Sequence, residues 1–88
     1  MVRQEGTISC ELHDHIEVAC LFGYELDVTL VDGSHVRGRA STTKTALGSE
    51  SLVLENRSGK CDIPLHEILT ISVLTPGARF QELQFRSA

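Results

Sequence analysis

The chain contains no tryptophan, one tyrosine and three phenylalanines among its 88 residues, so aliphatic side chains must dominate its core. No run of residues approaches the roughly 20 apolar positions that a membrane-spanning helix needs. The first seven residues lack the apolar stretch of a secretory signal. We therefore expect a cytoplasmic protein without a membrane contact. Its length indicates a single domain over residues 1–88, too small to enclose a deep active site.

Motifs for metal binding and catalysis are also absent. Two cysteines and two histidines occur close together, namely Cys10, His13, His15 and Cys20, but they form no CxxC or HxxxH pair of the kind that zinc sites use. On a helix the two cysteines would lie about 15 Å apart, too far for a disulfide, so we expect reduced thiols. The chain has neither a GxSxG elbow nor a glycine-rich phosphate loop. These absences predict a protein with no metal, no cofactor and no enzymatic activity.

Positive charge is missing from the front half of the chain. The formal net charge is −4, and the interval between Arg3 and Arg37 contains seven acidic residues and no lysine or arginine. From Arg37 onward there are seven basic and five acidic residues. An acidic front half repels nucleic acid and suits a basic partner. A merely solvated surface is the alternative interpretation.

Helical periodicity is confined to one segment, and we predict a helix over residues 9–22 after a flexible segment over residues 1–8. Ser9 is the expected N-cap, and Gly23 is the expected residue that ends the helix. One stripe of the helix is apolar and should pack on the rest of the molecule: Leu12, Ile16, Ala19 and Cys20. The remaining surface combines acids with two aliphatic residues: Glu11, Asp14, Glu17, Val18 and Leu21.

The period then changes to two residues, which predicts five antiparallel strands over residues 24–74. We place them at 24–30, 34–42, 50–55, 60–65 and 68–74, with a polar loop over 43–49. Asp32-Gly33 predicts a type I′ hairpin turn, and Gly38 inside a strand indicates a sharp bend. The expected fold is mainly β, a small closed or nearly closed barrel with the helix over one open end. The tail, residues 75–88, either adds a strand or docks loosely.

Small barrels often bind nucleic acid, so the basic residues of the predicted strands need separate consideration. The candidates are Arg37, Arg39, Lys44, Arg57 and Lys60. No exposed aromatic residue is clearly interleaved with them as a stacking platform for bases, and the net charge is negative. Solvated outer strand faces are the simpler interpretation.

Two segments resemble known families. Residues 28–38, with alternating apolar positions, Asp-Gly and a glycine, are similar to the first motif of Sm-like barrels, but the RNA-contacting turn of true Sm proteins is missing after Ile63. Residues 8–20 resemble the opening of the Rof (YaeO) family of Rho-binding antiterminators, with an Ile-x-Cys-acid pattern, an aspartate and an apolar-Glu-apolar-Ala-Cys run. The Asp-Gly hairpin and Ala40-Ser41 follow at similar distances. This second resemblance extends to Val73.

The Rof resemblance implies a helix on a five-stranded, Sm-like antiparallel barrel that binds the RNA-binding domain of the termination factor Rho. An acidic helix at the basic primary RNA site of Rho would block RNA loading and relieve termination. In the family's pattern, Leu12 replaces an acid and His13 replaces an aromatic residue. The expected partner-binding residues are Glu11, His13, Asp14, Glu17, Val18 and Leu21.

The resemblance implies a monomer that makes no direct contact with nucleic acid. Two other functions stay open from the sequence. The alternative function is an Sm-like RNA-binding module. Its assembly as a ring would require exposed edge strands, and its affinity for RNA would be sensitive to salt. The chain is also compatible with an interaction module for a different basic protein.

Overall fold

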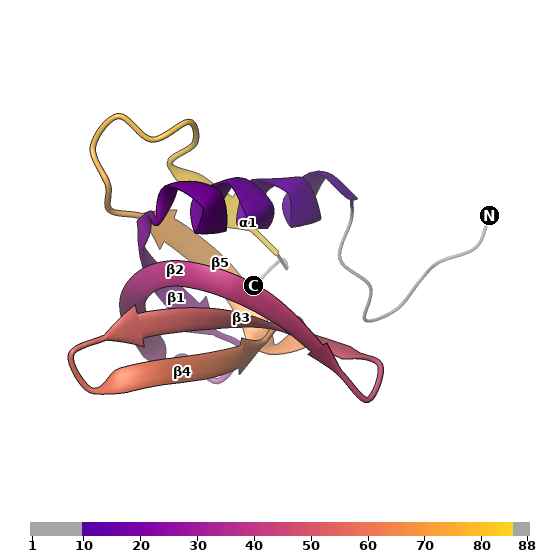
Figure 1. Cartoon of the computed structure of the whole chain (residues 1–88). Coiled ribbons are helices and arrows are strands. Elements are labelled where there is room, and N and C mark those ends of the chain that lie inside the picture. Colours follow the sequence, from indigo (N-terminus) through magenta and orange to yellow (C-terminus); the bar gives the residue numbers. More distant parts are fainter. Residues whose placement is uncertain (1–9, 86–88) are drawn as a thin grey trace.

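One helix is followed by six strands in this computed structural model, which describes residues 10–85, apart from the side chains of Cys10 and Glu11 (Figure 1). The elements are α1 (Cys10–Phe22), β1 (Glu25–Leu30), β2 (His35–Ala46), β3 (Ser49–Asn56), β4 (Gly59–Pro64), the short 3-10 helix η1 (Leu65–Glu67), β5 (Ile68–Val73) and β6 (Glu82–Gln84). The predicted mainly-β class with an N-terminal helix is confirmed. The segment 1–8 and the predicted N-cap Ser9 lie outside the described residues.

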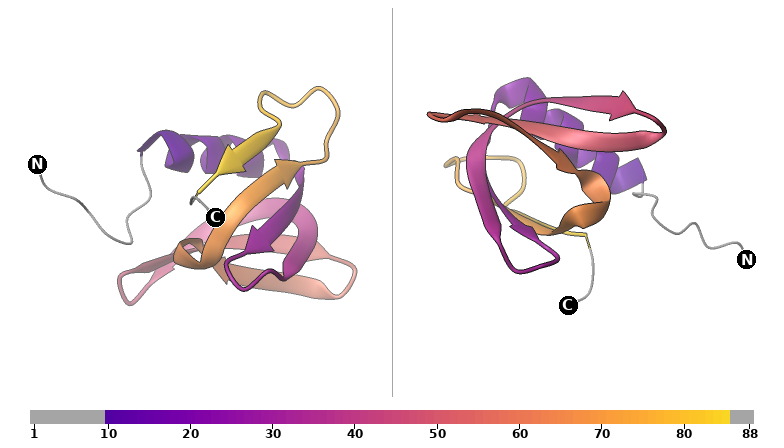
Figure 2. Two further views of the ribbon diagram at one scale, coloured as in Figure 1. Left: turned by 180° about the vertical axis from the view of Figure 1, so that it is seen from behind. Right: turned by 90° about the horizontal axis from the view of Figure 1, so that it is seen from below.

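All strand pairs are antiparallel and form one strongly curved sheet with the order β4-β3-β2-β1-β5-β6 (Figures 1 and 2). Strands β1 to β5 lie within residues 24–74, as predicted, but a sixth strand follows them and the sheet stays open between β4 and β6, so it does not form a closed barrel. The sixth strand comes from the tail, where Leu83 pairs with Ile71 of β5. The tail therefore adds a strand, which the sequence left undecided.

The second hairpin differs most from the prediction. β2 continues to Ala46, which pairs with Ser49, so only Leu47 and Gly48 form the turn in place of the predicted loop over 43–49. Both residues have positive φ, 54° and 76°, as a type I′ turn requires. The prediction failed because leucine is disfavoured at positive φ and because the polar run before it is rich in threonine, a good strand former.

The first hairpin turn lies at Asp32-Gly33 as predicted, but the turn type was wrong. The amide of Gly33 donates to the carbonyl of Leu30 and the amide of Leu30 donates to the carbonyl of Ser34, both at 2.8 Å. Only Gly33 has positive φ, 92°, so this is a three-residue loop with a glycine bulge and not a type I′ turn. The carboxylate of Asp32 accepts hydrogen bonds from the amide and hydroxyl of Ser34, which lower the pKa of Asp32.

The helix ends at Gly23 as predicted. The amide of Tyr24 donates to the carbonyl of Ala19 at 3.0 Å, and the amide of Gly23 donates to the carbonyl of Cys20 at 3.3 Å. Gly23 itself has φ 64°. This is the Schellman arrangement that lets the chain reverse at a glycine. It directs the chain straight from α1 into β1.

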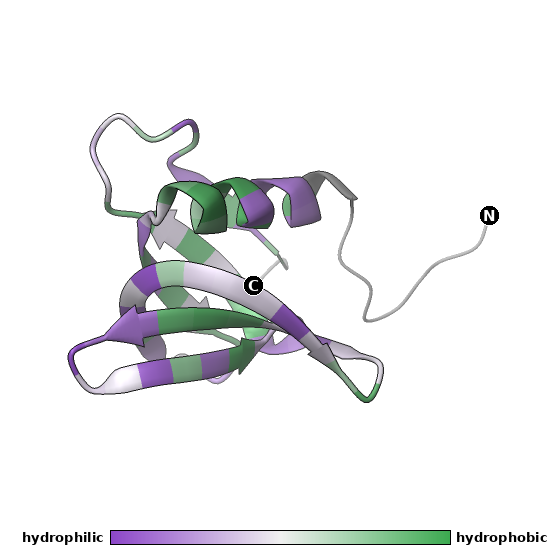
Figure 3. Ribbon diagram, in the orientation of Figure 1, coloured by the Kyte–Doolittle hydropathy of each residue, from purple (hydrophilic) through white to green (hydrophobic). Residues whose placement is uncertain are grey.

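Aliphatic residues from the helix and all six strands form one core. Ile16 and Ala19 are buried, and Leu12 and Cys20 pack at its margin, so the predicted apolar stripe is confirmed. In Figure 3 the hydrophobic colouring of α1 increases toward its C-terminal half. Gly38 is needed for a close approach between strands, because a Cβ there would lie 2.9 Å from the carbonyl oxygen of Glu55. β2 itself is irregular at Ser41, where its register with β3 shifts.

Candidate partner-binding surface

Three predicted site residues lie on the outer side of α1 and define what we call the acidic helix face: Asp14, Glu17 and Leu21. Their spacing of three and four residues places them on one side of a helix. Asp14 and Glu17 are exposed, and Leu21 keeps 77% of its surface exposed. The structure therefore brings two carboxylates and an apolar side chain together at the surface, as the sequence predicted.

Val18 differs from the three residues of the acidic helix face. Val18 is half-buried and packs against the core, so an aliphatic residue at this position already has a structural explanation. The expectation that Val18 projects among the acids as an exposed anchor is therefore only partly met. Glu11 belongs to α1, but its side chain lies outside the described residues.

His13 has an intramolecular partner. Its Nε2 atom lies 2.7 Å from Oε2 of Glu50 on β3, and its Nδ1 atom lies 3.6 Å from Oε2 of Glu17. The hydrogen bond to Glu50 is the main reason why the pKa of His13 is raised, with smaller contributions from the charges of Glu50, Glu17 and Asp14. His13 therefore ties α1 to β3, and its ring stays partly exposed.

An aromatic cluster holds the other end of the helix. Phe22 stacks on Tyr24 with 5.8 Å between ring centroids, and the guanidinium of Arg79 lies 5.3 Å from the Phe22 ring. Phe80 makes edge contacts with Tyr24 and His15, and the amide of Arg79 donates to the Tyr24 hydroxyl at 3.0 Å. These contacts fix the orientation of α1. The sequence could not indicate them, because the position of the tail was undecided.

Leu47 is a surface residue that the sequence pattern did not indicate. It is fully exposed at the tip of the β2–β3 hairpin and has φ 54°. Glu50, which holds His13, pairs with Thr45 of the same hairpin. The hairpin tip is thus connected to the N-terminal half of α1. The only signal in the sequence was an isolated Leu-Gly pair within a polar segment.

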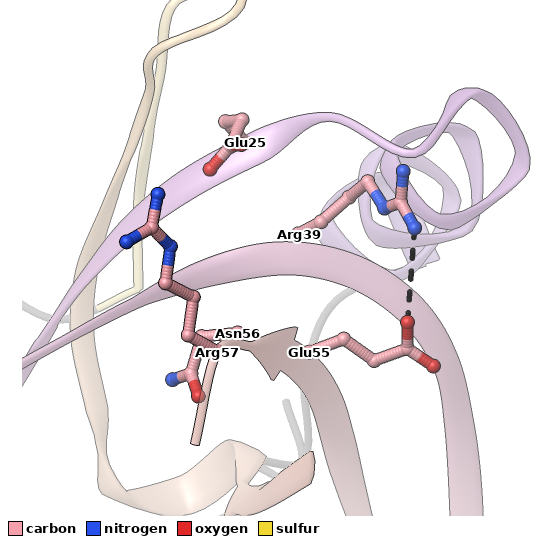
Figure 4. A pocket seen from close by; sticks show the side chains of 5 residues that line it. All are labelled: Glu25, Arg39, Glu55, Asn56 and Arg57. Atoms are coloured by element: carbon pink, nitrogen blue, oxygen red, sulfur yellow. Dashed lines mark ion pairs between the residues drawn. The ribbon is translucent and has the colours of Figure 1, made fainter. Parts of the chain in front are cut away.

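The outer face of the sheet carries a ladder of alternating charge. Glu25, Arg39, Glu55 and Lys60 are paired in register across four strands. Glu55 lies 3.8 Å from Arg39 and 3.6 Å from Lys60. A shallow hollow opens on this ladder, lined by Glu25, Arg39, Glu55, Asn56 and Arg57 (Figure 4). Its charges largely compensate one another.

The other basic residues considered for RNA binding are also mostly engaged. Arg37 pairs with Asp27 at 3.3 Å, and Lys44 pairs with Asp62. Arg57 is the one member of the five without an ion pair among the described residues, and in Figure 4 its side chain extends along the hollow on the side of Glu25. Of these five residues, only Arg57 is therefore available to RNA phosphates unless the ion pairs of the other four open.

The thiols and the acids do not assemble into a reactive centre in the part of the chain that the structure describes. Cys20 and Cys61 are unpaired, and burial raises the pKa of the Cys20 thiol, which makes it less reactive. No group of three or more His, Cys, Asp or Glu side chains within residues 12–85 is placed to hold a metal ion. Among the described helices, none has the length and apolar character that crossing a bilayer demands.

The fold and this surface define a small, mainly-β protein whose single helix covers an open antiparallel sheet and presents an acidic face to solvent. The family model of modulators of Rho-dependent transcription termination (ROF) matches residues 7–85, and the chain belongs to this family. The predicted Rof/YaeO membership is confirmed. The family is defined by regulation of termination, not by a catalysed reaction, and it implies Rho as the partner.

A solved structure supports the same fold. YaeO bound to magnesium from Vibrio cholerae O395 superimposes with a TM-score of 0.77, at 23% identity, over 83% of this chain and 96% of that chain. At this level of identity the likeness shows the fold alone. No curated protein matches the chain in sequence.

Proposed function

We propose that the chain inhibits Rho-dependent termination by placing its acidic helix face on the RNA-binding domain of Rho, where it blocks RNA loading at the basic primary site. The observation that carries this proposal is the surface formed by Asp14, Glu17 and Leu21. The two carboxylates are exposed, and α1 contains no lysine or arginine that would neutralise them. Family membership supplies Rho as the partner.

The chemistry of this face matches a site that holds RNA phosphate. Carboxylates at positions 14 and 17 would pair with the same lysines and arginines, so the chain and RNA should exclude each other on Rho. Charges at the rim of an interface mainly set the association rate, whereas a central apolar side chain contributes to the lifetime of the complex. Leu21 is the residue for this second role, because it is exposed without a packing function in the core. The His13–Glu50 contact supports the proposal by fixing the helix on the sheet.

Direct RNA binding is less well supported. Arg37, Arg39, Lys44 and Lys60 are ion-paired with acids on other strands of the sheet, so an RNA phosphate would have to displace a carboxylate at each position. We expect the isolated chain to bind single-stranded RNA weakly or not at all. Sub-micromolar, salt-sensitive binding to RNA in a filter or anisotropy assay would favour the Sm-like RNA-binding function instead.

The test is charge reversal on the helix. Asp14→Lys combined with Glu17→Lys should weaken binding to Rho by at least about 10-fold, which corresponds to about 1.4 kcal/mol. The matched control is Glu25→Lys combined with Glu82→Lys, which changes the net charge equally on exposed acids of β1 and β6. Each variant is titrated against Rho, with RNA-stimulated ATPase activity as the readout, and both should keep the wild-type circular dichroism spectrum.

Two outcomes would contradict the proposal. If the helix variant inhibits as well as the wild type while the strand control fails, the binding surface lies on the sheet. If the wild-type chain itself leaves both RNA binding and ATPase activity of Rho unchanged, blockage of RNA loading is wrong. The complex of the Leu21→Ser variant with Rho should dissociate faster than the wild-type complex. If both complexes have the same lifetime, Leu21 is excluded as an anchor.

A further inference from the structure

A cluster of ionisable side chains lies where α1 meets β3. His13 is at its centre, with 2.7 Å from Nε2 to Oε2 of Glu50 on β3 and 3.6 Å from Nδ1 to Oε2 of Glu17, one helical turn later. The charge of Asp14 also acts on His13. Because Asp14 and Glu17 belong to the acidic helix face, one histidine is connected both to the sheet and to the candidate partner-binding surface.

His13 supplies the positive charge that can form in this cluster. α1 contains no lysine or arginine, and its second histidine, His15, packs against an aromatic ring of the tail. β2 also contacts α1. It places the uncharged Thr45 opposite Glu50, and the adjacent Lys44 is held by an acid of β4. The carboxylates around His13 therefore depend on this imidazole for compensation.

Protonation of His13 changes the charge that the helix presents to a partner. With a neutral imidazole, the carboxylates of Asp14, Glu17 and Glu50 are uncompensated, whereas an imidazolium offsets one of their charges. A cation at position 13 also attracts Glu17 and repels the lysines and arginines of a basic partner. The hydrogen bond to Glu50 raises the pKa of His13 above its ordinary value, so this change of charge occurs near neutral pH.

We infer that His13 is a proton-sensitive counter-ion of the acidic helix face, and that its protonation weakens the binding of this face to a basic partner. This role rests on the proposed function, because it concerns the same face and the same partner. The proton that strengthens the contact between α1 and β3 reduces the negative charge offered to Rho. Since Rho then prefers the unprotonated chain, its binding should release the proton from His13.

The test compares the titrating wild type with two fixed charge states in the full-length chain. At about pH 6 and at about pH 9, His13→Gln is neutral and His13→Lys is positive. His66→Gln removes an exposed histidine of η1 and serves as the control. From the higher to the lower pH, the dissociation constant for Rho should rise about 2- to 5-fold more for the wild type than for His13→Gln. His66→Gln should change as the wild type does.

Two further readouts separate the charge of His13 from its packing. His13→Lys should show the same pH dependence as His13→Gln, but it should bind more weakly than His13→Gln at the higher pH. Calorimetry in buffers with different ionisation enthalpies should detect more proton release near neutral pH for the wild type than for either variant. Circular dichroism establishes that all variants are folded.

The outcomes distinguish the proton effect from the proposed function. If the wild type and His13→Gln show equal pH dependence, or if the wild type gains affinity at the lower pH relative to His13→Gln, the proton effect is overturned while the proposed function stands. If the wild type binds Rho at neither pH, the proposed function is wrong and the role of His13 falls with it. If His13→Gln does not fold, His13→Asn replaces it with the same readouts.

Discussion

The contact between His13 and Glu50 should make the stability of this protein depend on pH in a defined direction. Their side chains are each 31% exposed, with 2.7 Å between Nε2 and Oε2. The hydrogen bond to Glu50 raises the pKa of His13 above its ordinary value of 6.5. Because the folded state then binds the proton more tightly than the unfolded state, the contribution to stability is fully present below about pH 6.5 and is lost as the pH rises through the pKa of the folded state.

The perturbation is Glu50→Gln, which removes the carboxylate but retains the shape of the side chain. Exposed ion pairs contribute about 0.2–1 kcal/mol, and the short, partly buried geometry places this pair near the upper end. We expect Glu50→Gln to lower the free energy of unfolding by about 1 kcal/mol near pH 5.5 and by about half of that or less near pH 9. A neutral His13 can still donate a hydrogen bond to the amide oxygen, so the effect should not vanish.

Urea unfolding of both proteins at the two pH values measures this difference. Glu17→Gln is the control, because Glu17 lies farther from His13, at 3.6 Å, and its side chain is 61% exposed. This control should change stability by less than about 0.5 kcal/mol at either pH. If Glu50→Gln loses the same stability at both pH values, or loses more at high pH, the reasoning is refuted. Such a result would show that the charge of His13 does not contribute to the free energy of unfolding.

Three further predictions concern stability and are measured by urea unfolding. Ile16→Ala should lower the free energy of unfolding by about 2–4 kcal/mol, since Ile16 is 1% exposed, and wild-type stability would contradict the packing of α1. Gly33→Val should lower the free energy of unfolding by about 1–2 kcal/mol, because Gly33 has φ 92° and a residue with a side chain is strained at positive φ. Leu47→Gly should stabilise by up to about 1 kcal/mol, since relief of positive φ, about 1–2 kcal/mol, exceeds the entropic cost of glycine. A loss of stability there would mean that Leu47 makes contacts that its full exposure does not suggest.

The candidate surface was predicted in part, and the reason lies in the range of the interactions. Asp14, Glu17 and Leu21 share a helix face that follows from local spacing alone. The burial of Val18 depends on how far α1 tilts onto the sheet, and the engagement of His13 depends on Glu50, which lies 37 residues later. Periodicity contains no information about such pairs.

Local chemistry by itself determined the class of the fold. The change from helical to two-residue periodicity, the helix end at Gly23 and the positive φ at Gly33 follow from side-chain patterns and glycine conformation. The motif in residues 8–20 also sufficed for the family, because it combines specific residues at specific spacings.

The tertiary structure alone decided how the strands meet. The sequence could not indicate that Leu83 would complete the core beside Ile71, or that the sheet would stay open between β4 and β6. Pairing of strands distant along the chain depends on backbone hydrogen bonds, which are the same for every residue except proline, so the side-chain pattern does not specify the partner. The same holds for Arg37, Arg39 and Lys60, whose ion pairs exist because the strand register places an acid opposite each of them.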